Sequence, residues 1–243
     1  MPELLTTKQL AEYLQLSERS IYRLLEQGDI PAVKVGGQWR FRKSVVDEWL
    51  DIRIQQLDAG QLEDTVRDDL NSGTPSVGDL LSTENIFLYL PHRSRRDVLG
   101  ALVTLVNLPE DVDRDLLLAR LLEREAMCTT ALPDGVAVPH TPRPRPRLLA
   151  KHDVIALART REPIDFGALD GSLTDLFVLV LARDERAHLV LVARVNRLVR
   201  EPAVQHVMRT SRSPRQILRV IRQTEQLLFE APATDNRHGS GNR

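Results

Sequence analysis

Two histidines are best suited to nucleophilic chemistry: one ends an apolar run that is typical of a strand, and the other opens the helix predicted directly after such a run. His140 ends "GVAVPH" behind a rigid proline, and His188 follows the most apolar run of the chain, "LFVLVLA". A neutral imidazole is a competent nucleophile near pH 7, because its ordinary pKa is about 6.5. Functional groups gather at strand ends in open α/β sheets, so we expect both side chains at one edge of a sheet. On these residues alone His140 has two interpretations, a reactive group or a hydrogen-bonded surface imidazole.

The rest of the sequence offers little for other kinds of catalysis. The spacing of histidine, cysteine and acidic residues does not match a metal site, and no motif points to a hydrolase or a nucleotide-binding enzyme. We therefore expect neither a metal nor a cofactor. The single cysteine, Cys128, excludes an internal disulfide framework and favours a reducing, cytoplasmic setting. A small buried filler is the favoured interpretation of Cys128, ahead of a redox role.

The elements that must position the histidines lie in residues 76–230, where helical and strand patterns alternate. Apolar residues recur at helical spacing in four segments, and three further apolar runs are typical of strands. The predicted helices are 94–108, 113–125, 186–200 and 213–229, and the predicted strands are 135–140, 152–160 and 173–182. This alternation predicts an α/β domain in which a mixed sheet is flanked by helices on both faces.

Residues 1–56 have a different pattern, which predicts a small winged helix-turn-helix domain. Helices are predicted over 7–14 and 18–27, and Gly28 can take the left-handed position that ends the second one. Two alternating runs flank Gly36 and Gly37, which is typical of a two-residue hairpin. A third helix is predicted from Ser44, with an apolar face formed by Val45, Val46, Trp49 and Leu50.

The second helix of this domain can lie in a DNA major groove, and the hairpin can contact the backbone as a wing. Six Lys or Arg residues and three acidic residues lie between Glu18 and Lys43. The candidate DNA contacts are Ser17, which is also the predicted N-cap, Arg19, Ser20 and Arg23 on the helix, and Lys34, Gly36, Gly37, Arg40 and Arg42 on the wing. A module that contacts protein through a solvated basic face remains the alternative.

The two regions are joined by an acidic segment. Residues 57–75 are predicted to be a flexible linker, because acidic residues and turn formers dominate there, and the polar tail 231–243 is predicted to be disordered. The N-terminus has no signal-peptide pattern, and the longest apolar run is far shorter than the roughly 20 residues of a membrane helix. We therefore expect a cytoplasmic protein without membrane insertion.

The N-terminal stretch 6–50 resembles the excisionase-type, MerR-related winged helix-turn-helix family. Its most specific part is "GDIPAVKVG", followed by "WRFR", which joins the recognition helix to the wing. The resemblance implies double-stranded DNA as a partner, with the second helix in the major groove.

The larger region is similar to the enzyme IIA domain of the fructose and mannitol class of the phosphotransferase system, including its nitrogen-related regulatory branch. Two separated motifs carry the resemblance, "LLEREAMCTTALPDGVAVPHTPRP" and the later stretch from "PIDFGALDG" to "HLVLVARVNRLVREP". It implies that His140 accepts a phosphoryl group from an HPr-like phosphocarrier, that His188 assists, and that Thr130 belongs to the site. Arg143 lies within loop reach of the phosphate, whose geometry a guanidinium matches. The loop departs from the family where glycine is common, at Cys128, Ala131 and Pro133.

Together the two resemblances imply a transcriptional regulator in which phosphorylation of His140 changes DNA binding. A sugar phosphotransferase component that relays phosphoryl groups, and a docking or sensor protein that is never phosphorylated, stay open as alternatives. We expect the phosphoryl-transfer domain to serve regulation more than turnover. Whether the protein acts as an enzyme therefore stays open. A IIB-like or other regulatory protein and a homodimer are also left open as partners.

Overall fold

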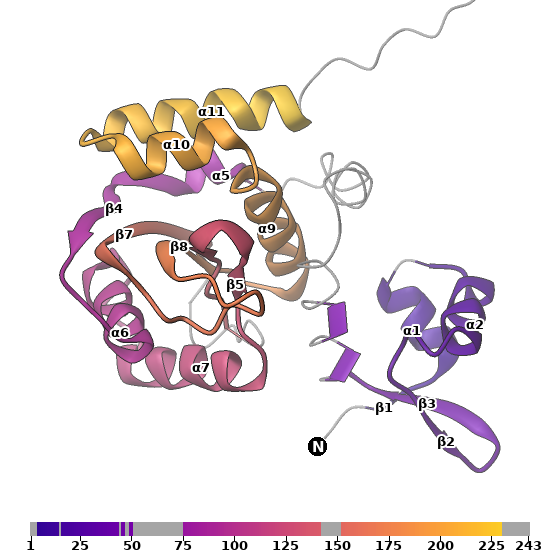
Figure 1. The fold of residues 1–243 in the computed structure, drawn as a ribbon. Coiled ribbons are helices and arrows are strands. Elements are labelled where there is room, and N and C mark those ends of the chain that lie inside the picture. Colours follow the sequence, from indigo (N-terminus) through magenta and orange to yellow (C-terminus); the bar gives the residue numbers. More distant parts are fainter. Residues whose placement is uncertain are drawn as a thin grey trace, which may run out of the picture.

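The computed structural model describes residues 4–14, 16–43, 45–46, 49–50, 75–141 and 152–229. These fall into an N-terminal region, up to residue 50, and a larger region from residue 75 (Figure 1). The predicted linker, apart from its last residue, and the predicted disordered tail lie outside the described residues.

The N-terminal region contains the two predicted helices, α1 (Thr7–Leu14) and α2 (Glu18–Glu26). Ser17 is the N-cap of α2, because its hydroxyl accepts a hydrogen bond from the backbone N–H of Ser20, which the first turn of a helix otherwise leaves unsatisfied. Gly28 has a φ of +69°, the left-handed conformation that ends a helix. Leu10, Ala11 and Ile21 are buried in the core between the helices and the wing.

The wing is the antiparallel hairpin of β2 (Val33–Val35) and β3 (Gln38–Arg42). Gly36 and Gly37 both have positive φ, as the tight turn requires. A short strand that we did not predict, β1 (Leu4–Leu5), pairs with the other edge of β3. Residues 45–46 and 49–50 are helical, whereas Ser44 lies outside the described residues. Val46 is buried but Val45 is 36% exposed, so the predicted apolar face was wrong at Val45.

The larger region is built on a five-stranded mixed sheet in the order β4-β7-β8-β6-β5. The strands are β4 (Leu81–Leu90), β5 (Ala131–Leu132), β6 (Val136–Ala137), β7 (Val154–Ile164) and β8 (Thr174–Leu181), with a 3-10 turn, η1 (Pro133–Gly135), between β5 and β6. Parallel pairs are β4–β7 and β6–β8, and antiparallel pairs are β7–β8 and β5–β6. The most apolar run therefore forms the central strand, as predicted.

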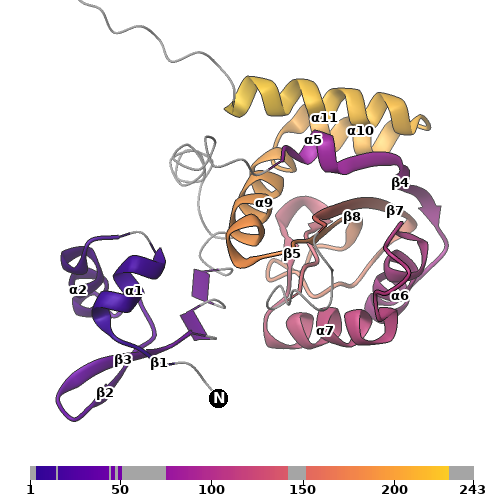
Figure 2. The same ribbon diagram turned by 180° about the vertical axis from the view of Figure 1, so that it is seen from behind.

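Helices cover both faces of this sheet, which confirms the predicted fold class (Figures 1 and 2). The helices α6 (Arg95–Leu105) and α7 (Arg114–Met127) pack on one face with Phe166 and Phe177. The other face is covered by α5 (Val77–Leu80), α9 (Glu185–Leu198), α10 (Pro202–Thr210) and α11 (Pro214–Phe229). Side chains of β8 alternate between the two cores, since successive residues of a strand point to opposite faces.

Aspartates and serines begin the helices that position the site. Ser94, Asp113 and Asp184 are the N-caps of α6, α7 and α9, and each accepts a hydrogen bond from a backbone N–H of the first turn. We predicted neither α10 nor the edge elements α5 and β4. The acidic composition of residues 57–85 obscured α5 and the start of β4, because it suggested a connection rather than packed structure.

Candidate functional site

His140 lies at the end of the sheet beside the central strand. Its backbone forms an isolated parallel bridge with Val180 of β8, and the N–H of Val180 donates to the carbonyl of Pro139 at 2.9 Å. Its side chain is buried, with only 1% of the residue exposed. The strand "GVAV" thus delivers the imidazole to a fixed position at the sheet edge, supported from behind by backbone hydrogen bonds.

Two neighbours fix which nitrogen of His140 carries the proton. Nδ1 lies 2.8 Å from the carbonyl oxygen of Val138, which can only accept a hydrogen bond, so Nδ1 carries the proton and donates. The Nε–H of Arg124 donates to Nε2 at 3.2 Å, which requires a lone pair on Nε2. The ring is therefore the neutral tautomer with its nucleophilic lone pair on Nε2, directed toward a guanidinium.

His188 lies next to this ring, as the sequence led us to expect for a histidine that opens the helix after the central strand. The two ring centroids are 5.2 Å apart and the planes are inclined at 65°, an edge-to-face arrangement. His188 stands in the first turns of α9 and is 5% exposed. Its position allows a ring N–H to donate to a group carried on the neighbouring imidazole.

Arg124 is the residue of this cluster that sequence reasoning missed. Its guanidinium is held by the Nη1–H bond to the carbonyl of Cys128 at 2.7 Å, in addition to the bond to His140. The residue is 2% exposed although its helix, α7, has an apolar inner face of Leu117 and Leu121. A charged side chain seven residues after Leu117 and three residues after Leu121 was the available signal, because this spacing places it on the apolar face and a charge is rarely buried without a specific task.

Glu125 is the second missed residue, and it holds the loop that precedes the histidine. Its carboxylate accepts the backbone N–H of Thr130 at 3.1 Å and also the hydroxyl of Thr130. The carbonyl of Thr130 in turn accepts the N–H of Val138, two residues before the histidine. Burial raises the pKa of Glu125, whereas the hydrogen bonds from Thr130 and the charge of Arg124 oppose that rise.

The structure thus brings the rings of His140 and His188 together, and it links Thr130 to them indirectly, through the carboxylate of Glu125 and the backbone of Val138. The predicted contact Arg143 lies outside the described residues. Cys128 is partly exposed, and its backbone carbonyl accepts a hydrogen bond from Arg124. Among the described residues no cluster of three His, Cys, Asp or Glu side chains could hold a metal ion. The arrangement offers one imidazole nucleophile with a fixed guanidinium and a second imidazole beside it.

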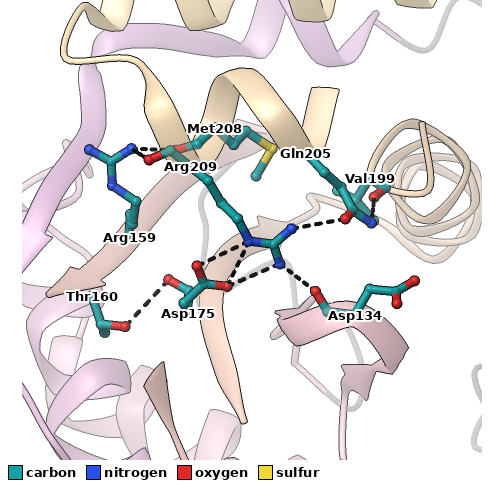
Figure 3. A network of polar contacts seen from close by, with 8 residues as sticks. All are labelled: Asp134, Arg159, Thr160, Asp175, Val199, Gln205, Met208 and Arg209. Atoms are coloured by element: carbon teal, nitrogen blue, oxygen red, sulfur yellow. Dashed lines mark hydrogen bonds and ion pairs between the residues drawn. The ribbon is translucent and has the colours of Figure 1, made fainter. Parts of the chain in front are cut away.

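A second polar cluster lies at the opposite end of β8 (Figure 3). Arg209 of α10 donates to both carboxylate oxygens of Asp175, and also to Gln205 and to the carbonyl of Asp134. Asp175 is five residues before Val180 on the strand, so the cluster lies roughly 16 Å from the histidine bridge. Its groups are paired with one another, which indicates a structural role in fixing α10 and η1 to the sheet.

The candidate DNA-contacting residues form an accessible face on the N-terminal region. Helix α2 exposes Ser17, Arg19 and Arg23, whereas Ser20 is partly buried and shares a hydrogen bond with the Ser17 hydroxyl. The wing exposes Lys34, Gly36, Gly37 and Arg42, and Arg40 is partly buried with bonds to Gln38 and to the Trp39 carbonyl. Lys43, counted in the basic stretch, is buried over the Tyr13 ring. The basic face is therefore made by exposed side chains of both the helix and the wing.

Two family descriptions match separate parts of the chain. Residues 79–224 match the family described as "Phosphoenolpyruvate-dependent sugar phosphotransferase system, EIIA 2", and residues 4–51 match "Helix-turn-helix domain". The first match covers more than half of the 243 residues and contains His140, His188, Arg124, Glu125 and Thr130.

Individual proteins are similar to this chain over about the same share of its length as the first match. The chain is 33% identical over 148 residues to a "Nitrogen regulatory protein" of Bradyrhizobium diazoefficiens, which covers 60% of this chain and 94% of that protein. A protein of the same name from Pseudomonas aeruginosa is 25% identical, over 58% of this chain and 92% of its own length. The crystal structure of nitrogen regulatory protein IIA-Ntr from Neisseria meningitidis has the same fold, with a TM-score of 0.55 at 22% identity, over 60% of this chain and 98% of that one. None of the described helices is long and apolar enough to span a membrane.

Proposed function

The chain belongs to the phosphoenolpyruvate-dependent sugar phosphotransferase system EIIA 2 family and carries an N-terminal helix-turn-helix domain, and on this premise we propose that it is a DNA-binding regulator controlled by phosphorylation of His140. The observation that carries the proposal is the tautomer of His140, with Nε2 unprotonated, buried and faced by the guanidinium of Arg124. A histidine kept only for packing needs neither a fixed lone pair nor a buried cation beside it.

The reaction is a transfer between two imidazoles. The phosphoryl donor is a phosphohistidine on an HPr-like phosphocarrier, whose P–N bond breaks and leaves its electron pair on the carrier's ring. The hydrogen bond from the Nε–H of Arg124 to Nε2 of His140 breaks first, because the lone pair that accepts it is the one that attacks phosphorus. This lone pair then forms the new P–N bond, while Nδ1 keeps the proton that it donates to the Val138 carbonyl. The ring becomes a phosphoimidazolium, and its positive charge is stabilised by that carbonyl. Phosphoryl transfer depends mainly on alignment and on positive charge near the oxygens, both of which this site provides.

The guanidinium of Arg124 is the stabilising charge. It faces Nε2 in the unmodified protein, so it lies beside the position of the incoming oxygens without rearrangement of the helix. His188, at a ring distance of 5.2 Å, can donate a second hydrogen bond to the phosphoryl group. Glu125 acts through Thr130 and is a positioning residue, because it holds the loop whose backbone supports the strand of the histidine.

Phosphorylation adds roughly two negative charges to a chain whose formal net charge is −1. DNA binding depends on neutralised phosphates, so added negative charge weakens it. We therefore propose that the phosphorylated protein leaves DNA more readily, and that the helix-turn-helix domain reads double-stranded DNA with α2 in the major groove. A IIB-like acceptor is the alternative destination of the phosphoryl group.

The test is a phosphotransfer reaction with phosphoenolpyruvate, enzyme I and an HPr-like carrier. We expect the full chain to gain one acid-labile phosphoryl group by intact mass, and His140→Ala to gain none. A carrier-dependent gain of mass in His140→Ala would move the acceptor elsewhere. No gain in the wild-type chain with each carrier of the source organism would leave a docking or sensor role as the better account. Fast onward transfer to a IIB protein would favour the sugar-relay alternative.

A further inference from the structure

The C-terminal helix α11 exposes a row of arginines on the outside of the larger region. Arg215, Arg219 and Arg222 recur at a spacing of four and then three residues, which places them on one face of the helix, and Arg212 stands in the turn just before it. All four are exposed. Figures 1 and 2 show α11 beside α10 along one side of the region, on the outer surface of the layer that covers the sheet.

The charge of this row is not neutralised by its neighbours. The only acidic residue of α11, Glu225, is buried, and its carboxylate accepts the backbone N–H groups of Val77 and Gly78. Of the elements packed against α11, α5 has Asp79, β4 has Glu84, and α9 has Glu185, with Asp184 as its cap. Helix α10 has no acidic residue of its own, and its N-cap Glu201 pairs with Arg197. Within the described part of the chain, Arg212, Arg215 and Arg219 make no ion pair.

The described residues that begin the larger region lie beside this helix. The first described residues after the connection are bound there: Arg222 donates to the carbonyl of Gly78, and Arg194 of α9 donates to the carbonyl of Pro75. Residues 51–74 can span at most about 80 Å by covalent geometry, which exceeds two helical turns of DNA at about 34–36 Å each. Covalent length therefore allows α11 and the helix-turn-helix domain to contact one duplex.

We propose that the exposed arginine row of α11 is a second, sequence-independent DNA contact that binds the phosphate backbone next to the site read by the helix-turn-helix domain. The Cα atoms of Arg215 and Arg222 are separated along the helix axis by about 10 Å, the axial length of about three phosphates on one strand. Guanidinium groups match phosphate geometry, and phosphate contacts are sequence-independent. This inference rests on the proposed DNA-binding function.

The test compares two triple variants of the full chain. Arg212→Gln, Arg215→Gln and Arg219→Gln together remove three of the four arginines of the row and keep Arg222, whose side chain donates to the carbonyl of Gly78. The control, Arg93→Gln, Arg96→Gln and Arg161→Gln, makes the same change in net charge at exposed positions outside the layer of α11. The probe is a fluorescein-labelled duplex of 40 base pairs and mixed sequence, titrated between 50 and 200 mM salt, with thermal melts to verify folding.

We expect the α11 triple variant to lose about 0.9 from the salt slope for each arginine that contacts a phosphate, or about 2.7 for three. The affinity ratio of wild type to variant then falls about 40-fold between 50 and 200 mM salt, while the control keeps nearly the wild-type slope. An unchanged slope in the α11 variant, or equal losses in both triple variants, would overturn the inference.

The same titrations separate this inference from the proposed function. If Arg23→Ala on α2 weakens binding and the α11 variant does not, the second contact fails and the helix-turn-helix interface stands. If the wild-type chain binds no duplex at 50 mM salt, the DNA-binding function itself fails, and the second contact fails with it.

Discussion

Replacing Arg124 with glutamine should slow phosphoryl acceptance by His140 without unfolding the domain. In the structure the guanidinium faces Nε2 at 3.2 Å and is 2% exposed, so water cannot take over its role at the phosphoryl oxygens. A hydrogen bond to a charged group contributes about 1.5–3 kcal/mol, and about 1.4 kcal/mol corresponds to a tenfold change in rate. Loss of this contact in the transition state therefore predicts a rate lower by about 10- to 150-fold.

The assay is quenched-flow transfer from a phosphorylated carrier, with intact mass as the readout at fixed carrier concentration. The matched control is Arg120→Gln, one turn earlier on α7, where the arginine forms a partly exposed ion pair with Glu123. We expect the control to transfer at the wild-type rate, since a surface pair contributes little. Circular dichroism melts separate a loss of rate from a loss of fold, because Arg124 also donates to the Cys128 carbonyl.

Wild-type kinetics in a folded Arg124→Gln variant would refute this reasoning. The guanidinium would then be a packing group that only holds the loop, and phosphoryl stabilisation would have to come from elsewhere. A slow variant whose rate returns to that of wild type in Arg124→Lys would instead show that charge matters more than the fork geometry.

Three further results are expected. Burial raises the pKa of Glu125, so between its ordinary and its raised pKa the folded chain binds more protons than the unfolded chain. The unfolding free energy therefore falls as pH rises through that interval. Glu125→Gln should flatten this pH dependence in urea unfolding, and parallel pH profiles for variant and wild type would contradict the prediction. Arg209→Ala should lower the unfolding free energy by about 1–3 kcal/mol, because it leaves a partly buried carboxylate without its partner, whereas exposed Arg212→Ala should stay within about 0.5 kcal/mol in the same measurement. Arg23→Ala should weaken binding to a duplex selected from a random pool by about 1–3 kcal/mol. Lys34→Ala should weaken binding to all sequences and reduce the salt slope by about 1. Unchanged DNA affinity in both variants would favour a module that contacts protein.

Elements whose pattern is local could be predicted from the sequence. The helix-turn-helix followed directly from apolar spacing, the Ser17 cap and the Gly36-Gly37 turn, and the central strand followed from its apolar run. Short or edge elements could not, because pairing decides them: β1 is two residues long, and β4 begins inside an acidic stretch. A strand of this kind can be assigned only when the strand that it pairs with is known.

The candidate site divides in the same way. His140 ends an apolar run and His188 opens the helix after another, so both could be singled out, but Arg124 and Glu125 look like ordinary charged residues of an amphipathic helix. Their burial depends on where α7 packs against the sheet, and the tautomer of His140 depends on a carbonyl and a guanidinium that meet only in the fold. Sequence can therefore nominate a nucleophile, whereas the groups that orient it require the tertiary arrangement.

The most direct test of the central claim is the DNA affinity of one preparation before and after phosphotransfer. The duplex is one that the full chain selects from a randomised pool, and binding is followed by fluorescence anisotropy at fixed salt with phosphoryl occupancy measured by mass. We predict weaker DNA binding after phosphorylation of the wild-type chain. For His140→Ala taken through the same treatment, we predict binding curves that superimpose. Identical curves for wild-type protein that carries a full phosphoryl group on His140 would contradict it.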